Sequence, residues 1–227
     1  MDSKVKISNN YSIDDYYHAR NSSDKELIAL IFKDRLEARY LKPIIDLNRN
    51  SVNNIGYGFS IMAIICSLIE FLASCRNGQY YLYKDDEFFN SSINYYSSKD
   101  IFIDFLKKNR PFKSEFNTAS YNSKYTNIAE EFYSEVRCPL FHSASTGKDW
   151  VIIANIDDYK IKHENDWNNK IISYDYKRLV SNINRTVFVE KLINYGMSYI
   201  NSVSSKIETY NKLTIFLDHL FDYSPSK

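Results

Sequence analysis

The feature that most restricts the fold is an apolar stretch, GFSIMAIICSLIEFLASC, at residues 58–75. Its length is close to that of a membrane-spanning helix, but Ser60, Ser67, Glu70 and Ser74 interrupt it. A helix that is apolar nearly all round and does not cross a membrane belongs at the centre of a bundle. The stretch therefore predicts a buried core helix and no membrane span.

The composition favours a mainly helical chain. Its 227 residues include only five glycines and four prolines, too few for the many turns of an all-β fold. Residues 1–22 are polar and aperiodic, which predicts a flexible N-terminal arm. The following SSDKE segment places Ser23 three residues before Glu26, the spacing of a capping box. We expect the first helix to begin there, with a kink at Pro43.

Further helices are expected over residues 98–108 and from about Thr126 onward. A stripe of apolar residues at helical spacing predicts the face of the second of these helices that packs on the core. The stripe consists of Ile128, Phe132, Val136 and Leu140.

The periodicity changes to two after this helix, from Trp150 to Ile161, which predicts a small antiparallel hairpin at about 149–173 with its turn at Asp157 and Asp158. Amphipathic helices are expected again over about 175–221. The prediction is thus a single mainly α domain over residues 23–227, with a hairpin inserted before its C-terminal helices.

The segment EEFYSEVRCPLFH, residues 130–142, carries the strongest functional signal. Four residues separate Arg137 from His142, and Pro139 lies between them. Five residues of ideal helix turn by about 500°, which would leave the two side chains about 140° apart. Proline lacks an N–H and clashes with the carbonyl four residues earlier, so a kink at Pro139 would let both side chains line one groove.

In this segment, and in the helix order from residue 24 to 145, the chain resembles the HEPN superfamily, named for higher-eukaryote and prokaryote nucleotide-binding domains. Its members are helical bundles with an Arg followed about four to six residues later by a His on a late helix. The resemblance implies a homodimer in which both Arg–His pairs face one cleft. It also implies metal-independent cleavage of single-stranded RNA, in which the ribose 2′-OH attacks its own phosphodiester and leaves a 2′,3′-cyclic phosphate.

The resemblance assigns a role to each residue of the pair. His142 would transfer a proton, since imidazole titrates near neutral pH. Arg137 would bind the phosphate and stabilise the charge that builds up in the transition state. Many catalytic members carry Asn, Asp or His directly after the Arg, whereas this chain has Cys138, and a thiol cannot replace those hydrogen bonds.

Four further residues are candidates for the same site, and each has a structural alternative. Glu70 either pairs with Arg137 as an orienting acid or faces solvent or another helix. Lys148 either contacts a backbone phosphate or belongs to a plain turn. Tyr133 and Tyr125 either stack on RNA bases or pack within the bundle.

Charge and cysteine usage limit the other possibilities. A net charge of +1 excludes a general coat for nucleic acid, so RNA contacts should be local. The three cysteines are widely spaced, which predicts a reducing cytoplasmic compartment without a disulfide framework or a zinc site. His163, Glu164 and Asp166 indicate a solvated turn rather than a metal site. No metal or other cofactor is expected.

Three functions remain open on the sequence alone. The first is the HEPN-type endoribonuclease, in phage defence or in a toxin–antitoxin pair with an antitoxin or other defence partner. The second is a non-catalytic HEPN-like module that binds a partner protein, a nucleotide or RNA. The third is an unrelated helical interaction protein in which the Arg–His spacing is accidental.

Overall fold

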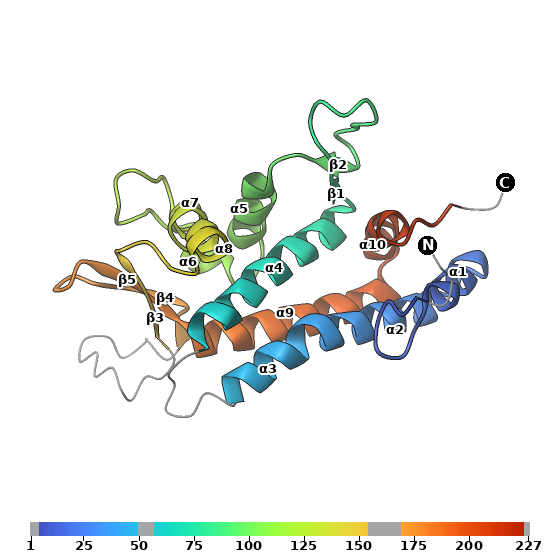
Figure 1. Ribbon diagram of the computed structural model, residues 1–227, viewed down its shortest axis with the longest axis horizontal. Helices are drawn as coiled ribbons and strands as arrows, with labels where there is room; N and C mark the ends of the chain where they lie inside the picture. Colours follow the sequence, from blue (N-terminus) through green and yellow to red (C-terminus); the bar gives the residue numbers. More distant parts are fainter. Residues whose placement is uncertain (1–4, 50–56, 154–168, 225–227) are drawn as a thin grey trace. The chain divides into compact units, whose positions relative to one another are not determined.

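Helices dominate the computed structural model, which describes residues 5–49, 57–153 and 169–224 of the chain. A small sheet accompanies them, so the predicted mainly α class is confirmed (Figure 1). The chain forms two compact units. Because four helices continue from one unit into the other, the single domain expected over residues 23–227 stays a prediction. The first unit comprises Met1–Pro43, Glu70–Ile101 and Gly196–Lys227, and the second comprises Ile44–Ile69 and Phe102–Tyr195.

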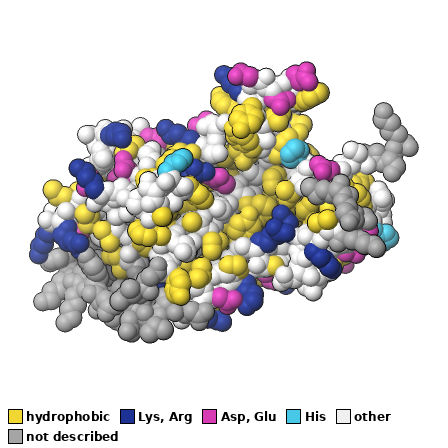
Figure 2. Space-filling view, in the orientation of Figure 1, with side chains coloured by type: hydrophobic (Ala, Val, Ile, Leu, Met, Phe, Trp, Pro, Cys, Tyr) yellow, Lys and Arg dark blue, Asp and Glu magenta, His cyan; other side chains and the backbone are white. Residues whose placement is uncertain are grey.

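The first unit is built mainly from helices. Its elements are α1 (Ile13–Asn21), α2 (Lys25–Leu36), the π-helical turn η1 (Glu37–Leu41), the end of α4 (Gly58–Asn77), β1 (Tyr80–Tyr81), β2 (Asn94–Tyr95), the start of α5 (Ser98–Lys108), the end of α9 (Arg185–Ser205) and α10 (Ile207–Leu220). The two short strands pair in parallel. Hydrophobic side chains gather on the exposed connection between them, where Tyr83 and Phe88 are 72% and 77% exposed (Figure 2).

Residues 13–21 form α1, so the prediction of a flexible arm over residues 1–22 is wrong for this part. The side chain of Ser12 caps the helix, and Asp15 accepts hydrogen bonds of 2.7 Å from both the N–H and the hydroxyl of Ser12. Ile13, Tyr16 and Ala19 are buried. The signal was present in the sequence as a capping box followed by apolar residues at helical spacing.

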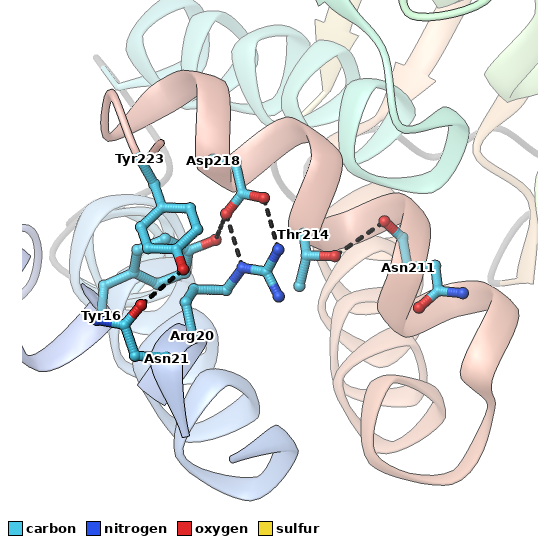
Figure 3. A network of polar contacts seen from close by, with 7 residues as sticks. All are labelled: Tyr16, Arg20, Asn21, Asn211, Thr214, Asp218 and Tyr223. Atoms are coloured by element: carbon cyan, nitrogen blue, oxygen red, sulfur yellow. Dashed lines mark hydrogen bonds and ion pairs between the residues drawn. The ribbon is translucent and has the colours of Figure 1, made fainter. Parts of the chain in front are cut away.

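A polar network joins α1 to α10 (Figure 3). The Tyr16 hydroxyl donates to Asp218 Oδ1 at 2.6 Å. Arg20 donates from Nε and Nη2 to the two oxygens of the same carboxylate, at 2.8 and 2.7 Å. Burial and the neighbouring Asp218 carboxylate raise the pKa of Tyr16. The bidentate ion pair thereby connects segments that lie about 200 residues apart in the chain.

Helix α2 begins one residue later than predicted. Its N-cap is Asp24, whose carboxylate accepts from the N–H of Leu27 at 2.9 Å, whereas Ser23 has a positive φ of 54°. The chain stays helical through Pro43, because η1 widens the helix just before it and α3 (Lys42–Arg49) continues beyond it. In place of the kink expected at Pro43, the structure has a π turn just before it.

The predicted core helix at residues 58–75 is confirmed as α4, Gly58–Asn77. It is the one helix in the described segments that is long and apolar enough to cross a membrane, a weak signal that buried core helices also give. Most of the helix is buried. It ends at Gly78, whose φ of 66° allows the N–H of Gln79 to bond the carbonyl of Ser74 at 3.1 Å, a Schellman-type cap.

The second unit packs helices and a sheet around a cluster of aromatic rings. Phe132 is at the centre of this cluster, since its ring lies 5.5 to 6.1 Å from those of Phe102, Phe116, Trp150 and Phe188. Besides parts of α3, α4, α5 and α9, the unit contains α6 (Lys113–Phe116), α7 (Ile128–Phe132), the π-helical turn η3 (Tyr133–Arg137), α8 (Cys138–Ser143), β3 (Trp150–Ile153), β4 (Ile172–Asp175) and β5 (Val180–Asn184).

The described residues of the second unit form a three-stranded sheet. Its strand order is β3-β5-β4, with β3 parallel to β5 and β4 antiparallel to β5. An antiparallel hairpin lies at residues 172–184. Of the hairpin predicted at about 149–173, the structure describes β3, whereas the turn at Asp157 and Asp158 and the second strand lie outside the described residues, so that hairpin stays a prediction. The helix expected from residue 175 begins at Arg185. Val180 and Ile183 have helical spacing, but backbone pairing with β3 and β4 makes this segment a strand.

Candidate functional site

The segment with the Arg–His pair forms one helical rod, α7–η3–α8, in the second unit. Asn127 caps it through a 3.1 Å bond from the N–H of Glu130. The stripe predicted to face the core is confirmed, because Ile128, Phe132, Val136 and Leu140 are all buried. Arg137 and His142 lie outside this buried stripe, Arg137 half-buried and His142 exposed.

The rod contains a π turn immediately before Pro139. The N–H of Cys138 bonds the carbonyl of Tyr133, five residues earlier. The carbonyl of Glu135, four residues before the proline, accepts instead from the N–H of Gly147 at 2.6 Å. The proline thus removes no hydrogen bond that this carbonyl needs, and the helix continues through it.

The π turn ends at Arg137, so the path from Arg137 to His142 is ordinary α-helix. Arg137 and Cys138 have φ, ψ of −61°, −50° and −64°, −52°. The predicted kink between the pair is therefore wrong. On a regular helix the two side chains leave the axis about 140° apart, and one protomer does not present them on a single helix face.

Arg137 is half-buried and lies between two aromatic rings. Its guanidinium carbon is 5.3 Å from the ring centroid of Tyr133 and 4.8 Å from that of Phe141, one turn before and one turn after it. The Tyr133 ring also contacts that of Phe102 at 5.5 Å. The structure therefore brings Tyr133 together with Arg137. Phe141, which is 47% exposed, was missed, although its i+4 spacing from Arg137 was visible in the sequence.

His142 is exposed in the last turn of α8. The helix ends at Ser143, and the next residue, Ala144, adopts a left-handed conformation while its N–H bonds the carbonyl of Pro139. The ring is therefore open to solvent. A core position, which would have favoured an unrelated helical protein, is not observed.

Tyr125 and Lys148 lie near a carboxylate that sequence reasoning did not single out. Glu135 accepts a short hydrogen bond from the Tyr125 hydroxyl, and Lys124 lies 3.7 Å from the same carboxylate. Contact with Tyr125, and then with Glu135, raises the pKa of Lys124. Gly147 packs so closely on Glu135 that a β-carbon there would clash with it. The exposed Lys148 follows directly, in the turn that the sequence predicted as the alternative.

Glu70 lies on α4 and is half-buried. It belongs to the first unit, whereas Arg137 and His142 belong to the second, so its pairing with Arg137 stays a prediction. Along the same stripe of α4, Ser74 is buried and donates to the Tyr95 hydroxyl at 3.4 Å.

No group of three or more metal-binding side chains is found within residues 5–49, 57–153 and 169–224. His163, Glu164 and Asp166 lie outside those segments. Cys66, Cys75 and Cys138 are not joined by disulfides, and burial raises the pKa of Cys75 well above its usual value.

Comparisons of the chain with protein-family models, with curated proteins and with solved structures find no match.

Proposed function

We propose that the chain is a metal-independent endoribonuclease of the HEPN type, which acts as a homodimer on single-stranded RNA. The observation that carries the proposal is the exposed His142 five residues after the half-buried Arg137, at the solvent end of one helical rod. Both groups can meet a ligand from solvent, as phosphodiester cleavage requires. The resemblance described above supplies the type of reaction.

Each group has a defined task in the proposed reaction. The ribose 2′-OH attacks the adjacent phosphorus, and the products are a 2′,3′-cyclic phosphate and a 5′-OH. As the bond from the 2′-oxygen to phosphorus forms, the bond to the 5′-oxygen breaks. His142 takes the proton from the 2′-OH or gives one to the departing 5′-oxygen, and water exchanges the other proton. Arg137, whose guanidinium lies near the rings of Tyr133 and Phe141, donates to the phosphate oxygens as their charge increases.

The α-helical spacing of the pair favours a site shared between protomers. Since Arg137 and His142 leave one helix in different directions, a two-fold dimer lets Arg137 of one protomer and His142 of the partner subunit act on the same phosphodiester. Glu70 remains a candidate to orient Arg137. Lys148 and Tyr125 are candidate contacts to the RNA backbone and bases.

Substitution of the pair tests the proposal. Wild-type protein is expected to cut single-stranded RNA in EDTA and to leave cyclic phosphate ends. Arg137→Ala and His142→Ala should each reduce the rate by at least about 100-fold, because each removes one catalytic interaction. The exposed His18 and Arg49 provide matched controls, and His18→Ala and Arg49→Ala should cleave at the wild-type rate.

Circular dichroism should show that the variants keep their fold, since neither Arg137 nor His142 belongs to the buried core. Cleavage that persists in His142→Ala, or that requires a divalent cation, would contradict the proposal.

A second candidate is a HEPN-like module that binds RNA, a nucleotide or a partner protein without catalysis. The uninterrupted helix between Arg137 and His142 favours it, as does the thiol of Cys138 where catalytic members carry a stronger hydrogen-bonding group. It predicts no cleavage, together with a ligand-dependent increase in Tm that Arg137→Ala abolishes.

The proposed setting is the cytoplasm, in phage defence or in a toxin–antitoxin pair with a dedicated partner protein. This part of the proposal is supported by the resemblance and by three cysteines that form no disulfide. It predicts that expression of the wild type slows growth of a bacterial host, and that expression of His142→Ala does not.

A further inference from the structure

A cavity of about 780 Å³ opens in the second unit, away from the Arg–His rod. The connection between α5 and α6, helix α6, the two residues that follow it and one residue of α9 line it, and it shares no lining residue with α7, η3 or α8. Six of the side chains that line it are basic or polar. These are Arg110, Lys113 and Lys191, and Ser114, Asn117 and Thr118.

Backbone and buried contacts hold the rim of this cavity in place. Asn109 is buried, and its carbonyl accepts from the N–H groups of Phe112 and Lys113 at 2.9 and 2.8 Å. Its side chain donates to the carbonyl of Phe105 at 2.7 Å and accepts from the Tyr195 hydroxyl at 3.3 Å. The turn that carries the basic side chains is thus arranged before any ligand arrives, which lowers the entropic cost of binding.

The positive charge of the cavity exceeds the negative charge that the described residues place beside it. Glu115 lies beside the cavity, and its Oε1 pairs with Lys191 Nζ at 2.7 Å. Its other oxygen accepts from the N–H groups of Ile171 and Ile172 at 2.6 and 2.9 Å. This carboxylate is therefore already occupied and cannot also neutralise the two remaining cations.

Arg110 and Lys113 are exposed at the cavity, and neither makes an ion pair with any described residue. Ser114 and Asn117 add a hydroxyl and an amide donor to the lining, whereas the Thr118 hydroxyl already donates to the carbonyl of Glu115 at 2.6 Å. An Arg fork, a Lys point charge and neutral donors together form the usual set of phosphate ligands. The volume lies within the range of about 300–1,000 Å³ that is typical of small-molecule sites.

We propose that this cavity binds the phosphate group of a small organophosphate, with Arg110 and Lys113 as the principal contacts. The site is separate from the proposed nuclease residues and does not depend on their activity. A small molecule fits better than a nucleic-acid strand, because the basic groups are gathered in one concave site rather than along a track.

Isothermal titration calorimetry with ribose 5-phosphate and with ribose tests the proposal directly. The phosphate ester should bind and ribose should not, and inorganic phosphate should compete with the ester. Arg110→Gln and Lys113→Gln should each weaken binding by at least about 10-fold, since each removes a charge-assisted hydrogen bond. Lys99→Gln removes the same charge from an exposed residue outside the cavity and should bind like the wild type.

Three results would overturn the proposal. The first is the absence of binding of ribose 5-phosphate, inorganic phosphate and adenosine 5′-monophosphate at millimolar concentration. The second is an equal loss of affinity in Lys99→Gln, which would indicate a general effect of charge. The third is a loss of affinity for a single-stranded oligoribonucleotide in Arg110→Gln without any binding of the small esters, which would assign the cavity to RNA instead. Both Gln variants alter exposed side chains, so unchanged Tm values are expected to confirm their folding.

Discussion

At the scale of single residues, the first unit shows how a buried hydroxyl is stabilised. Tyr16 is fully buried, and its hydroxyl donates a hydrogen bond to the Asp218 carboxylate, which also forms an ion pair with Arg20. A buried hydroxyl without a partner would be costly, whereas here the acceptor is ionised and oriented on both sides. The network in Figure 3 therefore stabilises the contact between α1 and α10.

Removal of the Tyr16 hydroxyl should cost stability without loss of the fold. Tyr16→Phe keeps the ring in place and removes one hydrogen bond to a carboxylate, which should lower the free energy of unfolding by about 1–2 kcal/mol. Tyr223→Phe is the matched control, because its hydroxyl bonds Asn21 at 2.8 Å in an exposed position and should matter little. Urea unfolding measures both values, and an equal effect of the two variants would contradict this account.

The residues of the candidate site differ in how far the sequence could predict them. The burial of Ile128, Phe132, Val136 and Leu140 followed from periodicity alone. The stacking of Arg137 on Phe141 and the hydrogen bond from Tyr125 to Glu135 depend on side-chain rotamers and on a loop that folds back. Such contacts have no fixed spacing in the sequence, so pattern analysis did not show them.

At the scale of elements, helix α1 depends on its N-terminal cap. The N–H and then the hydroxyl of Ser12 lower the pKa of Asp15, because both hydrogen bonds favour the ionised carboxylate. A carboxylate whose pKa is lowered in the folded state stabilises the protein above its ordinary pKa of 3.8, and this stabilisation is lost as the pH falls through the folded-state pKa.

Asp15→Asn should therefore lower the free energy of unfolding by about 1 kcal/mol at neutral pH. The difference from the wild type should shrink as the pH falls below 3.8. Asp14→Asn changes the exposed neighbour in the same turn and should have a smaller effect. Urea unfolding at pH 7, 5 and 3 tests this, and a difference between wild type and Asp15→Asn that grows in acid would contradict it.

Helices and strands were predictable to the extent that their patterns were unambiguous. The apolar α4 was predicted almost to its boundaries. The segment at residues 175–184 was assigned to a helix because Tyr176, Val180 and Ile183 have helical spacing, yet backbone pairing with β3 and β4 makes its second half a strand. Both π turns were missed, because one extra residue in a turn leaves the apolar pattern nearly unchanged.

At the scale of the whole molecule, the proposed function requires two copies of the chain. With a net charge of +1 the protein has no general attraction for RNA, so specific contacts must position the substrate. A single protomer presents Arg137 and His142 in different directions. In the proposed shared site, Arg137 of one protomer and the partner's His142 act on the same phosphodiester.

Mixed dimers provide a direct test of the shared site. In a heterodimer of one Arg137→Ala subunit and one His142→Ala subunit, a shared site joins the intact Arg137 of one copy to the intact His142 of the other. Such heterodimers, purified with two different affinity tags, should recover about half of the wild-type rate, whereas each mutant homodimer stays inactive.

If each site instead takes both residues from one chain, the mixed dimer will be as inactive as its parents. A protein that sediments as a monomer at all concentrations would contradict the proposal before any kinetics is measured.

The two π turns have a consequence for how this sequence can change. Each contains one residue more than a regular helix needs, and each is followed within two positions by a proline, Pro43 or Pro139. Shortening either turn by a single codon would restore regular winding and press the pyrrolidine ring against a carbonyl oxygen. The two π turns should therefore tolerate many substitutions but no deletions. Natural variants of the gene should preserve the length of these turns more strictly than their amino-acid identities.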